Sequence, residues 1–205
     1  MLSINLRNNP GYNYVHGLRD RPEKFSSYHI EDGSFLRLQN VSFKYNQDIV
    51  LQNVNLKINK NDKIIIKGVS GSGKSTLIKL ICGFYTPSEG GIFIDKINTK
   101  EINIENLRSQ ITMLNQNVKL FNTSIYDNVR YINNNIIDEN IDKFIDDNRI
   151  NLFNNVNLKQ NAGPNGNKLS GGQKQMTLII RCLFANKNVL ILDEPTSALD
   201  NYHFD

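Results

Sequence analysis

The chain has 205 residues, of which 39% are hydrophobic and 21% charged, with a formal net charge of +4 at pH 7. This length allows one sizeable core, so a single domain is expected. Its lysines are scattered among apolar positions, which indicates a solvated face and argues against a nucleic-acid partner. No apolar run approaches the roughly 18 residues of a membrane span, and no signal peptide opens the chain, so this polypeptide is expected to be soluble by itself.

The first third of the sequence predicts a tail followed by a strand-rich region. Residues 1–34 are polar and show no sustained periodicity, so we expect a linker or tail there. Apolar and polar residues alternate over 35–44 and again over 50–58, which predicts two neighbouring half-buried strands. The apolar run 64–66 predicts a strand buried on both faces of a parallel sheet. A glycine-rich loop, 68–73, and a helix, 75–82, are expected next.

The second half of the sequence changes in texture. Strands are predicted at 91–95 and 111–115, after which apolar residues recur at three- and four-residue spacing. That spacing predicts a small helical subdomain over about 117–180. A further helix is expected over 172–185, and a second fully buried strand over 189–193. Because strand–loop–helix units with long connections build parallel sheets, the fold class is predicted to be α/β with a mainly parallel core.

The two cysteines, Cys82 and Cys182, lie far apart in the sequence, and each sits inside an apolar run. That placement predicts buried, reduced thiols rather than a disulfide or a metal site.

The loop GVSGSGKS, residues 68–75, has the phosphate-binding pattern G-x-x-x-x-G-K-[ST] between a predicted strand and a predicted helix. Its glycines let backbone N–H groups surround a phosphate at the positive end of the helix. Lys74 is expected to reach the β- and γ-phosphates, and Ser75 to bind Mg²⁺ through its hydroxyl. The alternative is a glycine-rich turn that merely precedes a helix. The predicted nucleotide-binding residues of this loop are Gly68, Ser70, Gly71, Ser72, Gly73, Lys74, Ser75 and Thr76.

A pair of carboxylates follows the apolar run VLIL near the end of the chain. Parallel strands bring such residues to the carboxyl edge of the sheet, where phosphates bind. Asp193 is therefore predicted to hold Mg²⁺ through water, and Glu194 to orient or deprotonate the attacking water. The alternative is a helix cap or a surface acidic pair. Together with the loop, these residues predict ATP or GTP binding.

The stretch LSGGQ, residues 169–173, resembles the signature motif of the ATP-binding cassette (ABC) family, and EPTSALD, 194–200, resembles that family's Walker B motif and D-loop. The resemblance covers residues 35–200. It implies a P-loop NTPase core within 35–205, with a mainly parallel sheet, an N-terminal antiparallel β-subdomain and a helical signature subdomain. It also implies ATP and Mg²⁺ as cofactors.

The family resemblance implies a partner as well. ABC cassettes stack head to tail as homo- or heterodimers, with ATP sandwiched between them. Residues 170–172 open a predicted helix, so Ser170, Gly171 and Gly172 are expected to present unpaired N–H groups to the γ-phosphate held by the second cassette. The alternative is an ordinary helix start. The D-loop resemblance adds Asp200 to the expected nucleotide-binding residues.

Two more positions match the family's motifs. Gln116 resembles the Q-loop glutamine, which contacts Mg²⁺ and links the nucleotide site to the helical subdomain. Tyr45 resembles the A-loop aromatic residue that stacks on adenine. A strand-end glutamine and a core tyrosine are the structural alternatives. The resemblance makes Glu194, Gln116 and Lys74 the expected catalytic residues.

Residues 107–131 and 161–173 resemble the exporter branch of the family, of the multidrug-resistance-like type. This implies ATP hydrolysis that drives transport, through transmembrane domains of the same or another chain, with the cassette on the cytoplasmic or matrix side of a membrane. Asn161 and Pro164 stand where exporters carry acidic residues, which puts in question the coupling to the membrane domain. A soluble ABC ATPase and an importer subunit are the alternatives.

The sequence stops at Asp205, before the position of the family's switch histidine. We therefore expect a fragment of a longer ABC protein, with the C-terminal part of the core missing. Such a chain is expected to bind ATP with poor or absent turnover, because a γ-phosphate contact is lost.

Overall fold

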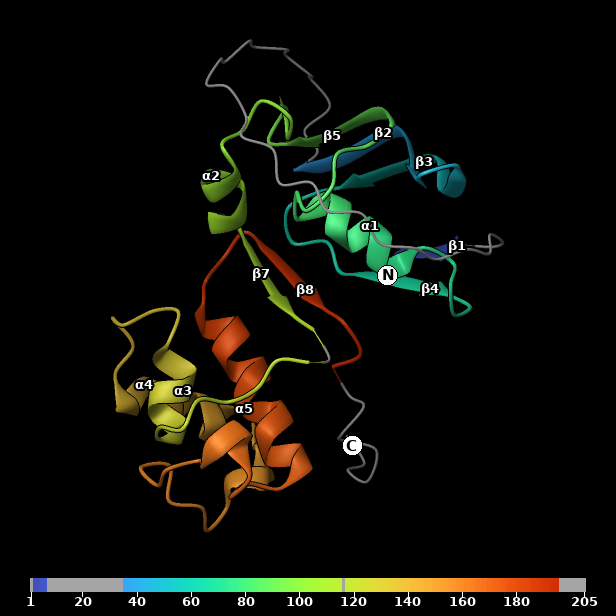
Figure 1. Ribbon diagram of the computed structural model, residues 1–205. Coiled ribbons are helices and arrows are strands. Elements are labelled where there is room, and N and C mark those ends of the chain that lie inside the picture. Colours follow the sequence, from blue (N-terminus) through green and yellow to red (C-terminus); the bar gives the residue numbers. More distant parts are fainter. Residues whose placement is uncertain (1, 7–34, 116, 196–205) are drawn as a thin grey trace. The chain divides into compact units, whose positions relative to one another are not determined.

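A computed structural model of the chain describes residues 2–6, 35–115 and 117–195 (Figure 1). The chain forms two compact units, residues 1–109 and 110–205, which we call the first and second units and describe separately.

The first unit contains an antiparallel sheet that joins segments far apart in the sequence. Its described strands are β2 (Leu36–Tyr45), β3 (Asp48–Ile58), β5 (Glu89–Ile94) and β6 (Ile97–Asn98), in the order β3-β2-β5-β6. The two strands predicted from the alternating patterns are confirmed, and they pair with each other in antiparallel fashion. The implied N-terminal antiparallel subdomain is therefore present.

A strand and a helix frame the glycine-rich loop in the first unit. Strand β4 (Ile64–Gly68) leads into the loop, and helix α1 (Lys74–Ile81) leaves it (Figure 1). Helix α1 contacts both β3 and β4 and turns one apolar face inward. The buried residues of the helix are Thr76, Leu77, Ile78, Leu80 and Ile81. A shorter helix, α2 (Ile104–Ser109), closes the unit.

The structure corrects two expectations about the environment of β4. Its isoleucines are only half-buried, so the prediction of a strand covered on both faces is wrong. Its strand partner among the described residues is β1 (Leu2–Leu6), which runs parallel to it with Leu6 opposite Gly68. A strand thus lies within the segment expected to be a polar tail. Residues 7–34 lie outside the described parts of the chain.

The second unit combines a parallel strand pair with helices. Strands β7 (Ile111–Leu114) and β8 (Val189–Leu192) pair in parallel, with Leu114 opposite Leu192. Between them in sequence lie α3 (Ile125–Arg130), α4 (Asp138–Asp147), α5 (Gly171–Phe184) and two 3₁₀ turns, Asn151–Phe153 and Pro164–Gly166. The helices expected from the three- and four-residue spacing are present. The mainly parallel core sheet stays a prediction, because the described parallel pairs β1–β4 and β7–β8 belong to separate sheets.

Strand β8 departs from the expected burial. Its side chains alternate between half-buried and exposed, and Leu190 and Leu192 are 39% and 38% exposed. Among the described residues, β7 is the only strand that pairs with β8. The apolar run VLIL correctly predicts the strand but overestimates its burial, because composition alone does not say how many neighbours cover a strand.

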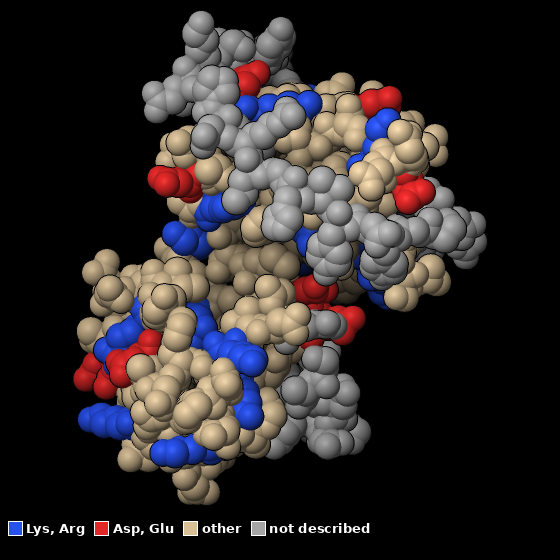
Figure 2. Space-filling model, in the orientation of Figure 1, with Lys and Arg blue, Asp and Glu red and all other residues tan. Residues whose placement is uncertain are grey.

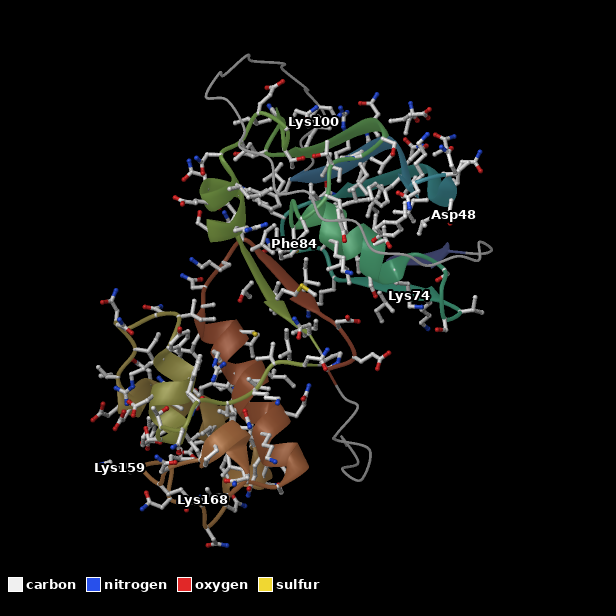
Figure 3. The ribbon with its side chains drawn as sticks, in the orientation of Figure 1. Asp48, Lys74, Phe84, Lys100, Lys159 and Lys168 are labelled. Carbon is white, nitrogen blue, oxygen red and sulfur yellow. The ribbon has the colours of Figure 1, made fainter. Side chains whose placement is uncertain are left out.

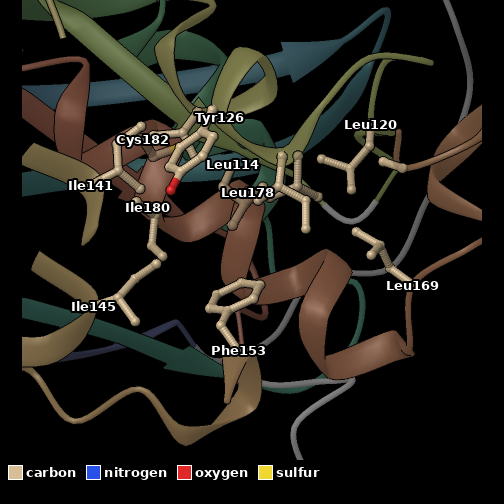
Figure 4. Packing of buried hydrophobic residues seen from close by; sticks show 13 residues of the cluster. Leu114, Leu120, Tyr126, Ile141, Ile145, Phe153, Leu169, Leu178, Ile180 and Cys182 are labelled. Atoms are coloured by element: carbon tan, nitrogen blue, oxygen red, sulfur yellow. The ribbon is translucent and has the colours of Figure 1, made fainter. Parts of the chain in front are cut away.

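The helices of the second unit pack around one apolar cluster, shown in Figure 4. It draws residues from β7, α3, α4 and α5, so it fixes these elements against one another. The buried members are Leu114, Leu120, Ile125, Tyr126, Val129, Ile141, Ile145, Phe153, Ala162, Leu169, Leu178, Ile180 and Cys182. At its edge, Tyr126 donates a 2.6 Å hydrogen bond to Asp142, which ties α3 to α4. Burial, and after it this hydrogen bond, raises the pKa of the Tyr126 phenol.

A buried polar contact joins α3 to α5 in the second unit. Asn128, with no exposed surface, accepts a hydrogen bond from the N–H of Phe121 and donates to the carbonyl oxygens of Phe121 and Ser124. The guanidinium of Arg181 donates to both the backbone oxygen and Oδ1 of Asn128, at 2.6 and 2.5 Å. Burial lowers the pKa of Arg181. We call Asn128, Arg181 and the loop 121–124 the polar clamp.

Both cysteines are buried and unpaired, as predicted. Burial raises the pKa of the Cys82 thiol to about 11, against a smaller opposing effect of Arg108, and burial also raises the pKa of Cys182. The thiolate, which is the reactive form, is therefore scarce at neutral pH.

We expect both thiols of the native chain to resist a thiol-specific disulfide reagent at pH 8. At that pH, about one Cys82 in a thousand carries a thiolate, and the sulfur is shielded from the reagent. The absorbance of the product released by the reagent should rise slowly for the folded chain. It should rise rapidly in guanidinium at about 6 M, a concentration that unfolds most domains. Rapid labelling of both cysteines in the native chain would contradict this burial.

None of the described helices is long and apolar enough to span a lipid bilayer.

Candidate functional site: a phosphate-binding loop and a capped glycine helix

The backbone of the glycine-rich loop is curled by two residues with positive φ. Gly71 has a φ of 78° and Gly73 a φ of 89°, a region that side chains with a Cβ rarely adopt. A Cβ on Gly73 would lie 2.8 Å from Cδ2 of Leu51, whereas one on Gly71 would meet no atom within 4 Å. Gly73 is thus required for packing against β3, whereas Gly71 borders open space.

Lys74, labelled in Figure 3, lies at the first position of α1 and folds back over the loop. Its Nζ donates to the carbonyl oxygens of Gly68 and Val69, at 2.8 and 2.9 Å. An ammonium group has three donors, so the positive charge is held at the mouth of the loop with one N–H left for a ligand. The binding of the β- and γ-phosphates by Lys74 stays a prediction.

The loop carries a further polar group without a partner. Ser72 is 6% exposed, and its Oγ has no hydrogen-bond partner among the described residues. A buried hydroxyl in this state costs free energy, which a bound acceptor would recover. Helix α1 begins here without a side-chain cap, so its first N–H groups also point into the loop. The residues present therefore suit a phosphate group.

Tyr45, at the end of β2, belongs to an aromatic cluster beside this loop. Its ring meets Phe43 and Tyr85 edge to face, with ring centroids 4.9 and 5.5 Å apart. Its hydroxyl lies 3.4 Å from Oγ1 of Thr76, on the first turn of α1. The structure thus places Tyr45 next to the phosphate-binding loop within the first unit.

The predicted carboxylates directly follow β8 in the second unit. The N–H of Asp193 donates to the carbonyl oxygen of Leu114 at 2.9 Å, which extends the pairing of β8 with β7 by one residue. Glu194 has a φ of 50°, so the chain turns sharply there, and its side chain is exposed. Both residues therefore lie at the carboxyl end of a parallel strand, as the sequence predicts.

The LSGGQ stretch forms the start of α5 through a reciprocal cap. The Oγ of Ser170 accepts from the N–H of Gln173 at 3.2 Å, and Oε1 of Gln173 accepts from the N–H of Ser170 at 3.0 Å. The expectation that Ser170 offers an unpaired N–H is therefore wrong, because Gln173 already occupies that donor. Gly171, at the first helical position, is exposed, and Gly172 is buried.

Helix α5 also contacts the turn after β8. Nε2 of Gln175 donates to the carbonyl oxygen of Pro195 at 2.9 Å, and Nε2 of Gln173 donates to the carbonyl oxygen of Leu152 at 3.1 Å. Within the second unit, the glycine-rich helix start and the acidic turn are thereby connected through one helix.

Two predicted site residues, Gln116 and Asp200, lie outside the described residues. The other predicted site residues are divided between the first and the second unit. Tyr45 and residues 68–76 are brought together in the first unit, and residues 170–172 are linked to the 193–195 turn in the second. On the face in Figure 2, Lys and Arg side chains are interspersed with Asp, Glu and uncharged residues within each unit.

Sequence reasoning missed three residues whose contacts are described above. Arg181 could have been noticed as a cation within the apolar run LIIRCLF, whereas Asn128 is one of many asparagines, and no sequence signal separates it from the others. Tyr85 follows the end of α1, and its contact with Tyr45 depends on sheet pairing between distant segments.

A strand–loop–helix phosphate site in one unit and a capped LSGGQ helix in the other define a P-loop nucleotide-binding protein of the cassette class. The chain belongs to the ABC transporter family, whose pattern matches residues 51–197. It is homologous to the nucleotide-binding domains of ABC exporters.

Individual relatives agree with this assignment. An ATP-dependent lipid A-core flippase of Francisella novicida is 40% identical over 176 residues, which cover 83% of this chain and 29% of the flippase. ABC transporter B family member 29, chloroplastic, of Arabidopsis thaliana is 40% identical over 180 residues, covering 81% of this chain and 27% of the relative. A solved bacterial Atm1-family ABC exporter with ATP bound superposes with a TM-score of 0.73 at 30% identity, covering 85% of this chain and 32% of that one. The chain spans less than a third of the length of each.

Proposed function

We propose that this chain binds ATP with Mg²⁺ and serves as the ATPase cassette of a membrane exporter. The observation that carries the proposal is the geometry of the loop at residues 68–76, where the Lys74 ammonium is bonded to two loop carbonyl oxygens and the hydroxyl of Ser72 is buried without a described partner. A cation, a buried donor and free helix N–H groups together form a site for a polyphosphate.

We assign the remaining roles at the nucleotide as follows. Tyr45 stacks on adenine, Lys74 binds the β- and γ-phosphates, and Ser75, Gln116 and Asp193 hold Mg²⁺, which neutralises charge on the phosphates. Glu194 orients the attacking water and accepts its proton. The exposure of Glu194 on a sharp turn after β8 supports this role, because a carboxylate there is accessible to substrate.

We further propose that two cassettes close over the nucleotide. The start of α5 would bind the γ-phosphate held by the opposite cassette, through the N–H groups of Gly171 and Gly172, with Asp200 nearby. The reciprocal cap between Ser170 and Gln173 holds the helix start in one conformation, which favours this contact. The partner is a second cassette, identical or related.

The substitution Gly171→Asp should test this contact. A carboxylate at the first position of α5 favours the helix itself, because it complements the helix dipole, but it repels a phosphate. We expect Gly171→Asp to keep the ATP affinity of its own loop and to lose dimer formation in Mg²⁺ and ATP, measured by analytical ultracentrifugation. Gly171→Asn, of nearly the same size but uncharged, is the matched control. Equal dimerisation of both variants would contradict the proposed contact.

The transport role follows from the relatives. Those with named activities include an ATP-dependent lipid A-core flippase, and the solved neighbour is an exporter with ATP bound. We propose by analogy that this cassette works with transmembrane domains of its own or another chain, on the cytoplasmic or matrix side of a membrane. The soluble ATPase and importer alternatives have no support from these relatives.

A further inference from the structure

We propose that Tyr85 is the positioning residue that holds the ring of Tyr45 in place for the adenine base. This inference rests on the proposed base-stacking role of Tyr45. It concerns the first unit alone, where all the contacts that follow are found.

The contact geometry points to Tyr85. Its ring centroid lies 5.5 Å from that of Tyr45 at an interplanar angle of 86°, and 5.3 Å from that of Phe43 at 33°. Phe43 also meets Tyr45, at 4.9 Å and 90°. Tyr45 is therefore held edge to face by two rings that touch each other. Edge-to-face pairs are a favoured aromatic geometry and stabilise beyond the area they bury.

The segment that carries Tyr85 is anchored at both ends. On its N-terminal side, α1 ends in a left-handed turn at Gly83, with the N–H of Phe84 bonded to the carbonyl oxygen of Lys79 at 2.8 Å. This helix end is a Schellman motif, which turns the chain sharply away from the helix axis. A Cβ at Gly83 would lie 2.7 Å from Cδ2 of Leu107, so the turn is closely packed.

On the C-terminal side, the N–H of Ser88 donates to the carbonyl oxygen of Ser42 at 2.9 Å, one residue before Phe43. Strand β5 then continues this pairing with β2. Tyr85 is thus fixed between the end of the phosphate-loop helix and the strand that carries Tyr45. Its ring contacts Phe43 and Tyr45 of that strand.

The hydroxyl of Tyr45 completes the arrangement at the other end of its ring. It lies 3.4 Å from Oγ1 of Thr76, whose side chain is buried in the first turn of α1. Two rings and one hydroxyl therefore set the orientation of Tyr45 relative to the phosphate loop. A base stacked on Tyr45 would be held in a defined position with respect to the phosphates, with less ordering cost on binding.

The test compares ATP with inorganic tripolyphosphate, a ligand that lacks the base, by titration calorimetry on the 205-residue chain. Tyr85→Leu keeps apolar bulk but removes the ring. We expect it to weaken ATP binding about threefold to tenfold and to leave tripolyphosphate binding unchanged. Tyr85→Phe should retain the affinity for ATP. Phe93→Leu, which removes a ring from β5 outside the aromatic cluster, is the matched control.

A double-mutant cycle shows whether Tyr85 acts through Tyr45. If it does, Tyr45→Leu combined with Tyr85→Leu binds ATP no more weakly than Tyr45→Leu alone. If Tyr45→Leu weakens ATP binding but Tyr85→Leu has the same ATP affinity as Phe93→Leu, the proposed role of Tyr85 is overturned and the role of Tyr45 stands. Unchanged ATP affinity of Tyr45→Leu would overturn the base-stacking role itself. Equal loss of both ligands in Tyr85→Leu would mean general disruption of the loop and would also overturn the proposal.

Discussion

Replacing Lys74 by alanine is expected to weaken ATP binding by roughly tenfold to a hundredfold, the range of charge-assisted hydrogen bonds of about 1.5–3 kcal/mol. The Nζ of Lys74 lies within 2.9 Å of two loop carbonyl oxygens, and these hydrogen bonds hold it at the mouth of the loop. The interaction with phosphate is therefore gained without much further loss of side-chain freedom. Titration calorimetry with ATP measures the effect.

The control for Lys74→Ala is Lys79→Ala on the same helix. Lys79 is exposed in the last turn of α1, so its loss removes the same charge without touching the loop. Only a local role of Lys74 separates the two variants, because any general effect of net charge is common to both. Equal ATP affinities for the two would show that the loop does not bind the phosphates through Lys74. Circular dichroism checks that both variants are folded.

The substitution Asn128→Ala is expected to lower the free energy of unfolding of the second unit by about 2–3 kcal/mol, the upper part of the range for leaving buried hydrogen-bonding groups unsatisfied. The side chain of Asn128 is fully buried and serves as acceptor for Arg181 and for the N–H of Phe121. Alanine would leave part of a buried guanidinium and several backbone groups without partners, and each such group carries a desolvation cost.

Urea unfolding followed by circular dichroism measures this loss, with Asn154→Ala as the control. Asn154 is exposed in the same unit, and the described hydrogen bond of its side chain is a 3.3 Å bond to Oδ1 of Asn151, so its replacement should change the unfolding free energy by less than about 0.5 kcal/mol. If Asn128→Ala unfolded at the same urea concentration as Asn154→Ala, the polar clamp would contribute little to the stability of the unit.

Much of the fold could be predicted from local patterns. The alternation in 35–44 and 50–58 identifies two paired strands, because a half-buried strand repeats its burial every two residues. The pattern GVSGSGKS identifies the strand, the loop and the helix around it, since each residue of that motif has a steric or hydrogen-bonding reason.

Long-range pairing could not be predicted. The strand at Leu2–Leu6 is short, and its partner β4 follows almost sixty residues later, so nothing local marks the pairing. The burial of β8 is lower than its sequence predicts for a related reason. An apolar sequence allows a strand to be buried, but the exposure of the strand depends on which neighbours lie beside it.

At the site, the sequence motifs predict which elements are present better than they predict the hydrogen bonds within them. The LSGGQ stretch correctly predicts a helix start. That the N–H of Ser170 is already taken depends on the side-chain conformation of Gln173, which the motif does not specify. The clamp between Asn128 and Arg181 and the contact between Tyr45 and Tyr85 each join residues from separate elements, and only the folded chain brings them together.

The clamp has a consequence for the order in which the chain acquires structure. Asn128 and Arg181 are 53 residues apart, so during synthesis the loop 121–124 emerges long before the guanidinium that holds its anchor in place. Contacts between such distant residues form late, since closing the intervening loop costs entropy first. The amide of Phe121, bonded to Asn128, should therefore exchange its hydrogen together with the opening of α5 rather than with its sequence neighbours. We therefore expect the loop 121–124 and α5 to fold as one cooperative unit.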